Sequence, residues 1–546
     1  MNHRFEMVVA IMATLLMQGV SVLGAAEKIP LQMGVPFGDG AVLQQQTKVP
    51  VWGWTVPKAK VTVRFAGQEV SVTADETGKW VATLRPLEAD KVTDPAVAPT
   101  GKTMTVTASK DAATVVSEIK DILVGEVWFC AGQSNMGWGL THVINGAHEI
   151  AKAQYPVIRK LPMGARATAI PMEKGPVLRW VPCTPAVAPN FTATGYYFAR
   201  NLLEELKVPI GLLHVTRGGG VIEPFISPGA YLASKKLPKE RAFVARSMSV
   251  DALKSYARFE KDYSKWFSTL KKRADGTLVA AFPMPALPGF EITQPSVGFN
   301  NAIMPLIPYA MRGAIWYQGE SNAIHSKPKI KTGRNYLFKM EALVDGWRKL
   351  WGLGDFPFYY VQLANFGGSK KTPEMGDATA MIRQAQLEAL KIKNTGMAVM
   401  IDGNGSIHPP NKQETGRRLA LWALAKQYGR KDIVFSGPLY KSFRIQGSKI
   451  RIIFNHAESG LMAAKKEMLK PAVEDKGAKI EWLSIQGKDK KWHWADGVFD
   501  GNDLIVSSED VTEPIAVRYA YSANPKGCNL YNRAGLPAAT FTTTDY

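Results

Sequence analysis

Polar residues and glycines follow four apolar segments of the sequence, at the points where those segments would end as strands. Segment 122–129 leads into Gly132, Gln133, Ser134 and Asn135. Three later segments lead into Gly218 to Gly220, into Gln318 with Glu320 and Asn322, and into Asp402 with His408. Because the carboxyl ends of parallel strands lie at one edge of a sheet, we expect these residues to meet around one cleft.

This set of residue types suits acyl transfer from an ester. The reaction needs a nucleophile, a base and donors for the oxyanion, and a hydroxyl, an imidazole, glycine backbone and a side-chain amide are available here. Gly132 also permits a tight turn and a close approach of substrate. Two simpler interpretations remain, with Ser134 as a helix N-cap and His408 as a structural hydrogen-bonding residue. The four sets together favour the catalytic interpretation.

The elements that position these residues alternate between strand and helix from residue 118 to residue 430. Apolar runs predict strands, and amphipathic spacing predicts helices, one of them at 192–206 and another at 412–428. This order predicts an α/β domain with a parallel sheet and helices on both faces. An insertion at about 223–294 interrupts it, and apolar residues at helical spacing from Leu253 to Leu270 predict one long helix there.

The regions on either side of this domain have short alternating strands between glycine and proline breaks. We predict a β-sandwich-like domain at 27–117 and a second β domain at 431–546. Residues 1–26 resemble a secretory signal peptide, with an apolar stretch at 7–23 and a small-residue cleavage site, so we expect a secreted or periplasmic protein. An uncleaved anchor is the alternative, and no other run approaches membrane length.

Composition narrows the possible ligands. The chain has 546 residues and a formal charge of +20, yet its lysines are scattered and no nucleic-acid-binding motif is present, so we predict a solvated basic surface and no nucleic acid partner. The eight histidines show no metal-ligand spacing, so we expect no metal and no cofactor. The sequence does not indicate the oligomeric state. Its three cysteines do not make a disulfide framework, although a single disulfide bond between two of them remains an alternative. They are Cys130, Cys183 and Cys528.

Several motifs resemble the sialate O-acetylesterase family of the SGNH hydrolase superfamily. The three strand-end motifs carry most of the likeness, and weaker matches extend it over most of the chain. The strand-end motifs are Gly132-Gln-Ser-Asn-Met, Trp316-Tyr-Gln-Gly-Glu-Ser-Asn and Ile407-His-Pro-Pro-Asn-Lys-Gln-Glu-Thr-Gly-Arg-Arg-Leu, and the weaker ones are at 40–45, 49–53 and 529–537.

The resemblance implies a flavodoxin-like hydrolase domain that removes acetyl esters from sugars, with O-acetylated sialic acid as the leading substrate. Ser134 would be the nucleophile and His408 the base. The amides of Ser134 and Gly219 and a side-chain amide of the Gln318 motif would hold the oxyanion. We expect the substrate to be bound by Gln133, Asn135, Asn322 and Arg217, with Trp138 and Tyr317 as possible stacking faces.

The sequence departs from the family pattern at two places. Arg217 stands where relatives usually carry Trp, and Gly405 stands three residues before His408, where superfamily members often carry an acid. The residue that orients His408 is therefore Asp402, Glu320 or a backbone carbonyl. This departure keeps two alternatives to a sialate esterase open, a glycan-binding relative without activity and a hydrolase of other esters. Acetylated xylan is a further alternative substrate.

Overall fold

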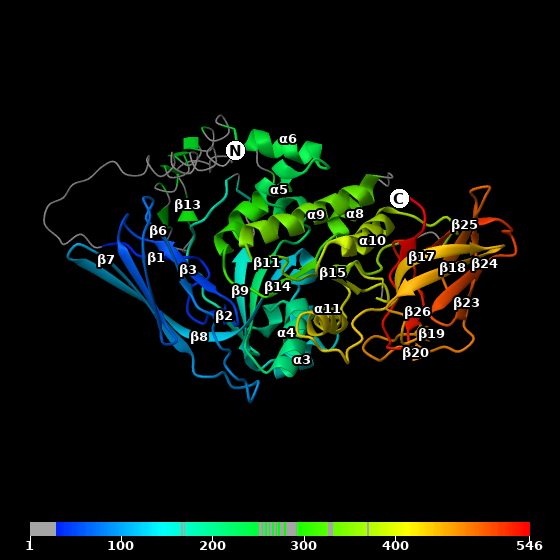
Figure 1. Cartoon of the computed structure of the whole chain (residues 1–546), viewed down its shortest axis with the longest axis horizontal. Coiled ribbons are helices and arrows are strands. Elements are labelled where there is room, and N and C mark those ends of the chain that lie inside the picture. The colour runs from blue at the N-terminus through cyan, green and yellow to red at the C-terminus, as the bar shows by residue number, and fades with distance from the viewer. Residues whose placement is uncertain are drawn as a thin grey trace.

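The computed structural model describes residues 29–545, apart from most of residues 250–292, residues 326–330 and positions 165, 166, 169, 369, 370 and 404. Its centre is the main path of an 11-stranded sheet, and neighbouring strands on this path are parallel except at one antiparallel edge strand, β10 (Figure 1). Along the sheet the strands are β10 (Val181–Cys183), β9 (Tyr155–Gly164), β11 (Ile210–Thr216), β8 (Ala113–Gly132), β14 (Gly313–Tyr317), β15 (Phe358–Gln362) and β16 (Thr395–Val399).

Helices cover both faces of this sheet, as the apolar strands require. Every residue of β14 and β15 is buried, which is typical of parallel strands enclosed on two sides. On one face α9 (Lys331–Trp351) packs against α10 (Ala378–Glu388), and on the other α4 (Ala193–Leu206) packs against α11 (Lys412–Lys426) (Figure 1). Smaller helices are α2 (Ser134–Gly137), α3 (Gly146–Lys152), α5 (Pro228–Ala233), α6 (Pro238–Ser247) and α8 (Glu320–Ile324).

The N-terminal β region is joined to the central sheet by a single long strand. The first part of β8 pairs with β7, and its alternating exposure fits a sheet with one wet face, whereas residues 122–132 are all buried within the parallel sheet. Asp121 bends the strand with φ of +57°. The other strands of this region are β1 (Gln32–Met33), β2 (Val42–Gln44), β3 (Val49–Trp54), β4 (Lys60–Phe65), β5 (Gln68–Thr73), β6 (Lys79–Leu84) and β7 (Lys102–Lys110).

The C-terminal β region consists of three small sheets that pack against the central domain. Arg383 of α10 is fully buried and fastens the two parts, because its guanidinium donates to the carbonyls of Leu363 and Ala364 and to those of Ser522 and Ala523. The strands are β17 (Leu439–Gln446), β18 (Lys449–Asn455), β19 (Leu461–Lys465), β20 (Val473–Glu474), β21 (Leu483–Gly487), β22 (Trp492–Trp494), β23 (Asp496–Asp500), β24 (Asp503–Ser507), β25 (Pro514–Tyr519), β26 (Leu530–Asn532) and β27 (Phe541–Thr542).

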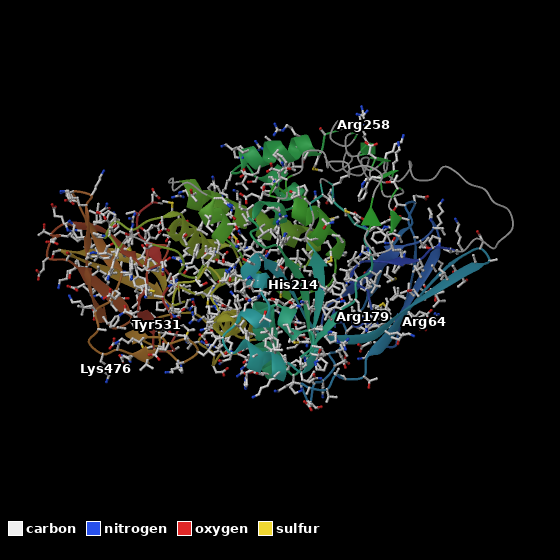
Figure 2. All side chains as sticks on the ribbon, turned by 180° about the vertical axis from the view of Figure 1, so that it is seen from behind. Arg64, Arg179, His214, Arg258, Lys476 and Tyr531 are labelled. Carbon is white, nitrogen blue, oxygen red and sulfur yellow. The ribbon has the colours of Figure 1, made fainter. Side chains whose placement is uncertain are left out.

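The chain thus has a mixed α/β fold with β-rich regions on either side, and the predicted strand and helix order of the centre is found. Most of the helix predicted from Leu253 to Leu270, and the predicted signal peptide, lie outside the described residues. Within the described ranges, no helix combines the length and the apolar character needed to cross a membrane. Basic side chains such as Arg64 and Lys476 lie at opposite ends of the molecule (Figure 2), and all three cysteines are free and buried.

Candidate active site

The turn after β8 brings a serine and a histidine into contact. Ser134 Oγ lies 2.8 Å from His408 Nε2, and both side chains are partly exposed. The turn requires glycine at position 132, where φ is +146° and a Cβ atom would stand 2.1 Å from the carbonyl oxygen of Tyr317. Helix α2 then begins at Ser134, so that the side chain leaves the sheet at the carboxyl edge. This contact has the geometry of a nucleophile and its base.

His408 is held by its loop and by an aromatic ring. The carbonyl of Ile407 accepts a hydrogen bond of 2.8 Å from Asn135 Nδ2, and the His408 amide donates to Ser406 Oγ at 3.2 Å. The imidazole stacks on Trp138, with ring centroids 4.0 Å apart and planes inclined by 23°. Burial, together with the charges of Lys412 and His142, lowers the pKa of His408. At neutral pH the imidazole is therefore mainly unprotonated and able to accept a proton.

A buried polar network lies beside this serine and histidine. Asn135 donates from Nδ2 to Glu320 Oε1 and accepts at Oδ1 from Lys412 Nζ, and all three side chains are buried. Glu320 Oε2 has no hydrogen-bond partner among the described residues, and burial raises the pKa of this carboxyl. Burial lowers the pKa of Lys412 to about 7. Asn135 thus links the ends of β8 and β14 to the loop that carries His408.

The amides of the Gln318 motif are used within the protein. Gln318 Nε2 donates to Asn322 Oδ1 at 2.7 Å and approaches the Gly220 carbonyl and Gln133 Oε1 at 3.2 and 3.3 Å. Asn322 Nδ2 in turn donates to Glu223 Oε2 at 3.0 Å. Both side-chain amides thus donate to neighbouring protein groups, so Gln318 and Asn322 shape the loops after β11 and β14.

Two backbone amides remain available near Ser134. The Ser134 N–H is the first of a helix, where no intrahelical acceptor exists, and neither it nor the Gly219 N–H is hydrogen-bonded to a described residue. Gly218 and Gly219 are exposed and follow β11, which pairs directly with β8. Arg217 is partly exposed beside them, its amide donates to the Gly132 carbonyl at 3.1 Å, and its guanidinium makes no hydrogen bond to a described residue.

Neither acid considered for orienting His408 is bonded to it. Asp402 is buried, forms two hydrogen bonds of 2.8 and 2.7 Å with the guanidinium of Arg418, and accepts a third from Tyr531 at 3.2 Å. Glu320 is bonded to Asn135, as described above. Among the residues described, no carboxylate makes a hydrogen bond to His408, and no group of three potential ligands could hold a metal ion.

The sequence did not single out Lys412 or the contact between Trp138 and His408. Lys412 occupies the first position of α11, where a cation opposes the helix dipole, and this unusual placement is the feature that could have marked it. Trp138 was expected as a sugar-stacking face, whereas one aromatic neighbour of its ring is His408 and another is His142, at 4.6 Å. Which rings meet depends on the tertiary fold and is invisible in a single sequence.

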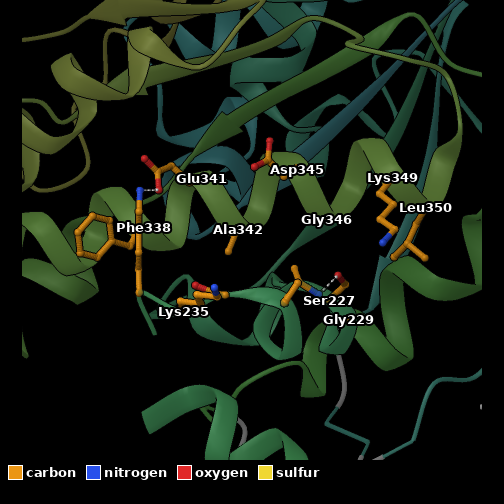
Figure 3. Close-up of a pocket in the computed structure, with 14 residues that line it drawn as sticks. Ser227, Gly229, Lys235, Phe338, Glu341, Ala342, Asp345, Gly346, Lys349 and Leu350 are labelled. Carbon is orange, nitrogen blue, oxygen red and sulfur yellow. Dashed lines mark hydrogen bonds and ion pairs between the residues drawn. The ribbon is translucent and has the colours of Figure 1, made fainter. Parts of the chain in front are cut away.

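A separate pocket lies between α5 and α9 and has a volume of about 470 Å³ (Figure 3). Phe338, Glu341 and Asp345 of α9 line it opposite Ser227 and Lys235 from the α5 side. The lining contains two serines, Ser227 and Ser234, but no histidine that could pair with either of them. We assign it no part in the chemistry.

Comparisons with known proteins identify the chemistry of this family. A family model described as carbohydrate esterase, sialic acid-specific acetylesterase, matches residues 299–420. The sialate O-acetylesterase of Mus musculus is 27% identical over 541 residues, 92% of each chain, and that of Homo sapiens is 27% identical over 90% of this chain and 88% of its own.

A solved structure is similar over nearly the whole fold. It is a carbohydrate acetylesterase from Xanthomonas citri, 30% identical, which superimposes with a TM-score of 0.74 over 95% of this chain and 100% of its own. This relative includes both β-rich regions as well as the central sheet. The chain therefore belongs to the sialate O-acetylesterase family of carbohydrate esterases and is a carboxylic ester hydrolase.

Proposed function

We propose that this protein is an exported esterase that removes O-acetyl groups from sialic acids, with Ser134 as nucleophile and His408 as base. The observation that carries the proposal is the 2.8 Å contact between Ser134 Oγ and His408 Nε2 at the carboxyl edge of the sheet. The curated relatives are named sialate O-acetylesterases, which supports the choice of sugar. The finer architecture that we propose is an SGNH-type hydrolase domain with a flavodoxin-like sheet, flanked by two β-sandwich-like domains.

The reaction would proceed in two steps through an acetylated serine. His408 Nε2 accepts the Ser134 proton as Oγ attacks the acetyl carbonyl, and it then donates this proton to the departing sugar oxygen. Water next attacks the acetyl-serine with His408 again as the base, which releases acetate and restores the hydroxyl. The lowered pKa of His408 favours the neutral imidazole that both attacks need.

The oxyanion of each tetrahedral intermediate needs preorganised donors. We propose the backbone N–H groups of Ser134 and Gly219, because neither is hydrogen-bonded to a described residue and both lie at the ends of adjacent strands. Gln133 adds a side-chain amide next to the nucleophile, since its Oε1 accepts weakly, at 3.4 Å each, from the amides of Gly319 and Ser321 and its Nε2 donates to no described residue.

Recognition of a carboxylated sugar would depend on Arg217. Its guanidinium is partly exposed, is not paired with a described carboxylate, and follows the strand that pairs with β8. A planar guanidinium matches a carboxylate with two parallel hydrogen bonds, and the charge of +20 attracts anionic glycans. Neutral acetylated glycans have no carboxylate with which the Arg217 guanidinium could pair.

The proposal is tested by acetate release from O-acetylated sialoglycan, acetylated xylan and p-nitrophenyl esters of increasing chain length. We expect the sialoglycan and p-nitrophenyl acetate to be cleaved, and Ser134→Ala to lose nearly all turnover, whereas Ser109→Ala in β7 serves as the matched control. Activity on xylan alone would overturn the sialate assignment and spare the mechanism. A Ser134→Ala protein that kept more than about a tenth of the activity would overturn the nucleophile.

A further inference from the structure

We infer that Trp138 is a positioning residue for His408, whose indole face holds the imidazole against Ser134 and stabilises the imidazolium formed during each proton transfer. The inference rests on the proposed esterase mechanism. It assigns to an aromatic ring two of the tasks that a carboxylate performs in a serine–histidine–aspartate triad, namely orienting the imidazole and stabilising the imidazolium.

The first support is the position of the indole relative to both reacting groups. Trp138 lies four residues after Ser134, and its amide donates to the Ser134 carbonyl at 2.8 Å. Its own carbonyl accepts from Ala193 at 2.8 Å, which fixes it to the start of α4. Ser134 and Trp138 are therefore parts of one short turn. Because His408 stacks on the indole of Trp138 at 4.0 Å, the stack fixes the imidazole relative to Ser134 Oγ.

The second support is that the two acids considered for His408 have other partners. Asp402 is bonded to Arg418 and Tyr531, and Glu320 is bonded to Asn135. At position 405 there is no side chain, φ is +84°, and a Cβ atom would already lie 3.3 Å from the Asn524 amide. The ring of Trp138, by contrast, stacks on the imidazole, with centroids 4.0 Å apart.

The third support is the electrostatics of the stack. The face of an indole attracts a cation within about 6 Å of its centre, and the centroids here are closer than that. The charges of Lys412 from α11 and of His142 lower the pKa of His408 and therefore act against an imidazolium. The indole face opposes this repulsion, and its attraction appears only when His408 carries the proton. Such an interaction lowers the barrier without tightening substrate binding.

The rival role for Trp138 is a stacking platform for the sugar, and kinetics separate the two. A sugar platform binds substrate, so its loss raises KM for acetylated sugar and leaves p-nitrophenyl acetate unaffected. A positioning residue acts through His408, so its loss lowers kcat on both substrates. Trp138→Phe and Trp138→Leu differ in whether an aromatic face remains.

We would therefore measure kcat and KM for wild type, Trp138→Phe and Trp138→Leu on p-nitrophenyl acetate and on an O-acetylated sugar. We expect Trp138→Leu to lose about 5- to 30-fold in kcat on both substrates with KM little changed, and Trp138→Phe to keep an intermediate rate. Trp494→Leu is the matched control, because Trp494 is partly exposed in the C-terminal β region and packs against Trp482.

A spectroscopic measurement tests the contact between Trp138 and His408 without a substrate, and so independently of the proposed function. The ring protons of His408 should be shifted upfield by the indole in NMR spectra of the wild type, and this shift should vanish in Trp138→Leu. Equal kcat values for the Phe and Leu variants, or an effect confined to KM for sugar, would overturn the inference. Absence of the upfield shift would overturn it as well, whatever the activity. Loss of sugar cleavage alone would count against the proposed function only.

Discussion

Replacing Lys412 by methionine removes the buried ammonium while keeping the length of the side chain. In the folded protein burial lowers the pKa of Lys412 to about 7, whereas an unfolded chain would titrate this lysine near 10.5. Between these two values the unfolded state binds one proton more than the folded state. The free energy of unfolding therefore rises with pH over this window, by about 1.4 kcal/mol per pH unit, and the full cost of burying the lysine is present below pH 7.

The methionine variant has no such proton, so its stability should lack this rise. From pH 7.5 to 9.5 the wild type should gain about 2 to 3 kcal/mol of unfolding free energy over Lys412→Met. At the upper end of the range the variant should also be weaker by about 1–3 kcal/mol, because Asn135 Oδ1 loses its donor.

Urea unfolding followed by tryptophan fluorescence at several pH values measures both effects. The exposed Lys60→Met in β4 is the control, and its unfolding curves should follow those of the wild type at every pH. Titrating groups that do not interact with Lys412 are shared by the two proteins and cancel in the comparison, whereas the pKa values of Glu320 and His408 rise when Lys412 is removed, because its charge lowers both. Parallel stability profiles for the wild type and Lys412→Met would refute the reasoning, since they would mean that Lys412 keeps its ordinary pKa in the folded protein.

Three further outcomes are expected. Asp402→Asn should destabilise the fold by about 3–5 kcal/mol in urea unfolding, because it leaves the buried Arg418 without its main counter-charge. The kcat of the folded fraction should stay near wild type, and a loss of about 10³ in kcat would instead make Asp402 the orienting acid. The acid limb of kcat/KM should titrate below pH 6.5, because burial lowers the pKa of His408, and a limb at or above 6.5 would contradict this environment. Gly132→Ala should abolish both activity and correct folding, since its Cβ atom would collide with the Tyr317 carbonyl, and a fully active Gly132→Ala enzyme would show that the turn can relax.

The strand ends could be predicted because local chemistry determines them. An apolar run ends where glycine and polar side chains begin, and this rule predicted a strand that ends before Gly218, where β11 ends at Thr216. The helix at 192–206 was predicted from its amphipathic spacing, and α4 is found there, with Thr192 as a cap that accepts from the Gly195 amide. These features depend on neighbours within a few residues.

The partners of the buried charges could not be predicted in this way. Asp402 is near His408 in sequence, but its carboxylate is bonded to Arg418, one helix away, and to Tyr531, 129 residues away. Glu320 is likewise bonded to Asn135 across two strands. Tertiary packing determines which of these distant side chains form hydrogen bonds, and the sequence alone is equally consistent with several sets of partners. The stacking of Trp138 on His408 belongs to the same class.

Strand β8, which runs from the N-terminal β region into the central sheet, limits where the chain can be truncated. A cut between residues 117 and 118, where sequence composition changes, would fall in the middle of a continuous strand whose far end forms the Ser134 turn. Arg159 holds the bend of that strand, since its guanidinium donates to the carbonyls of Asp121 and Gly40 at 2.5 and 2.9 Å. The N-terminal β region thus supports the turn that carries Ser134. Amides on both sides of the bend should exchange their hydrogens together, as one cooperative unit, and pulling on the N-terminal region should strain the Ser134 turn before the region detaches.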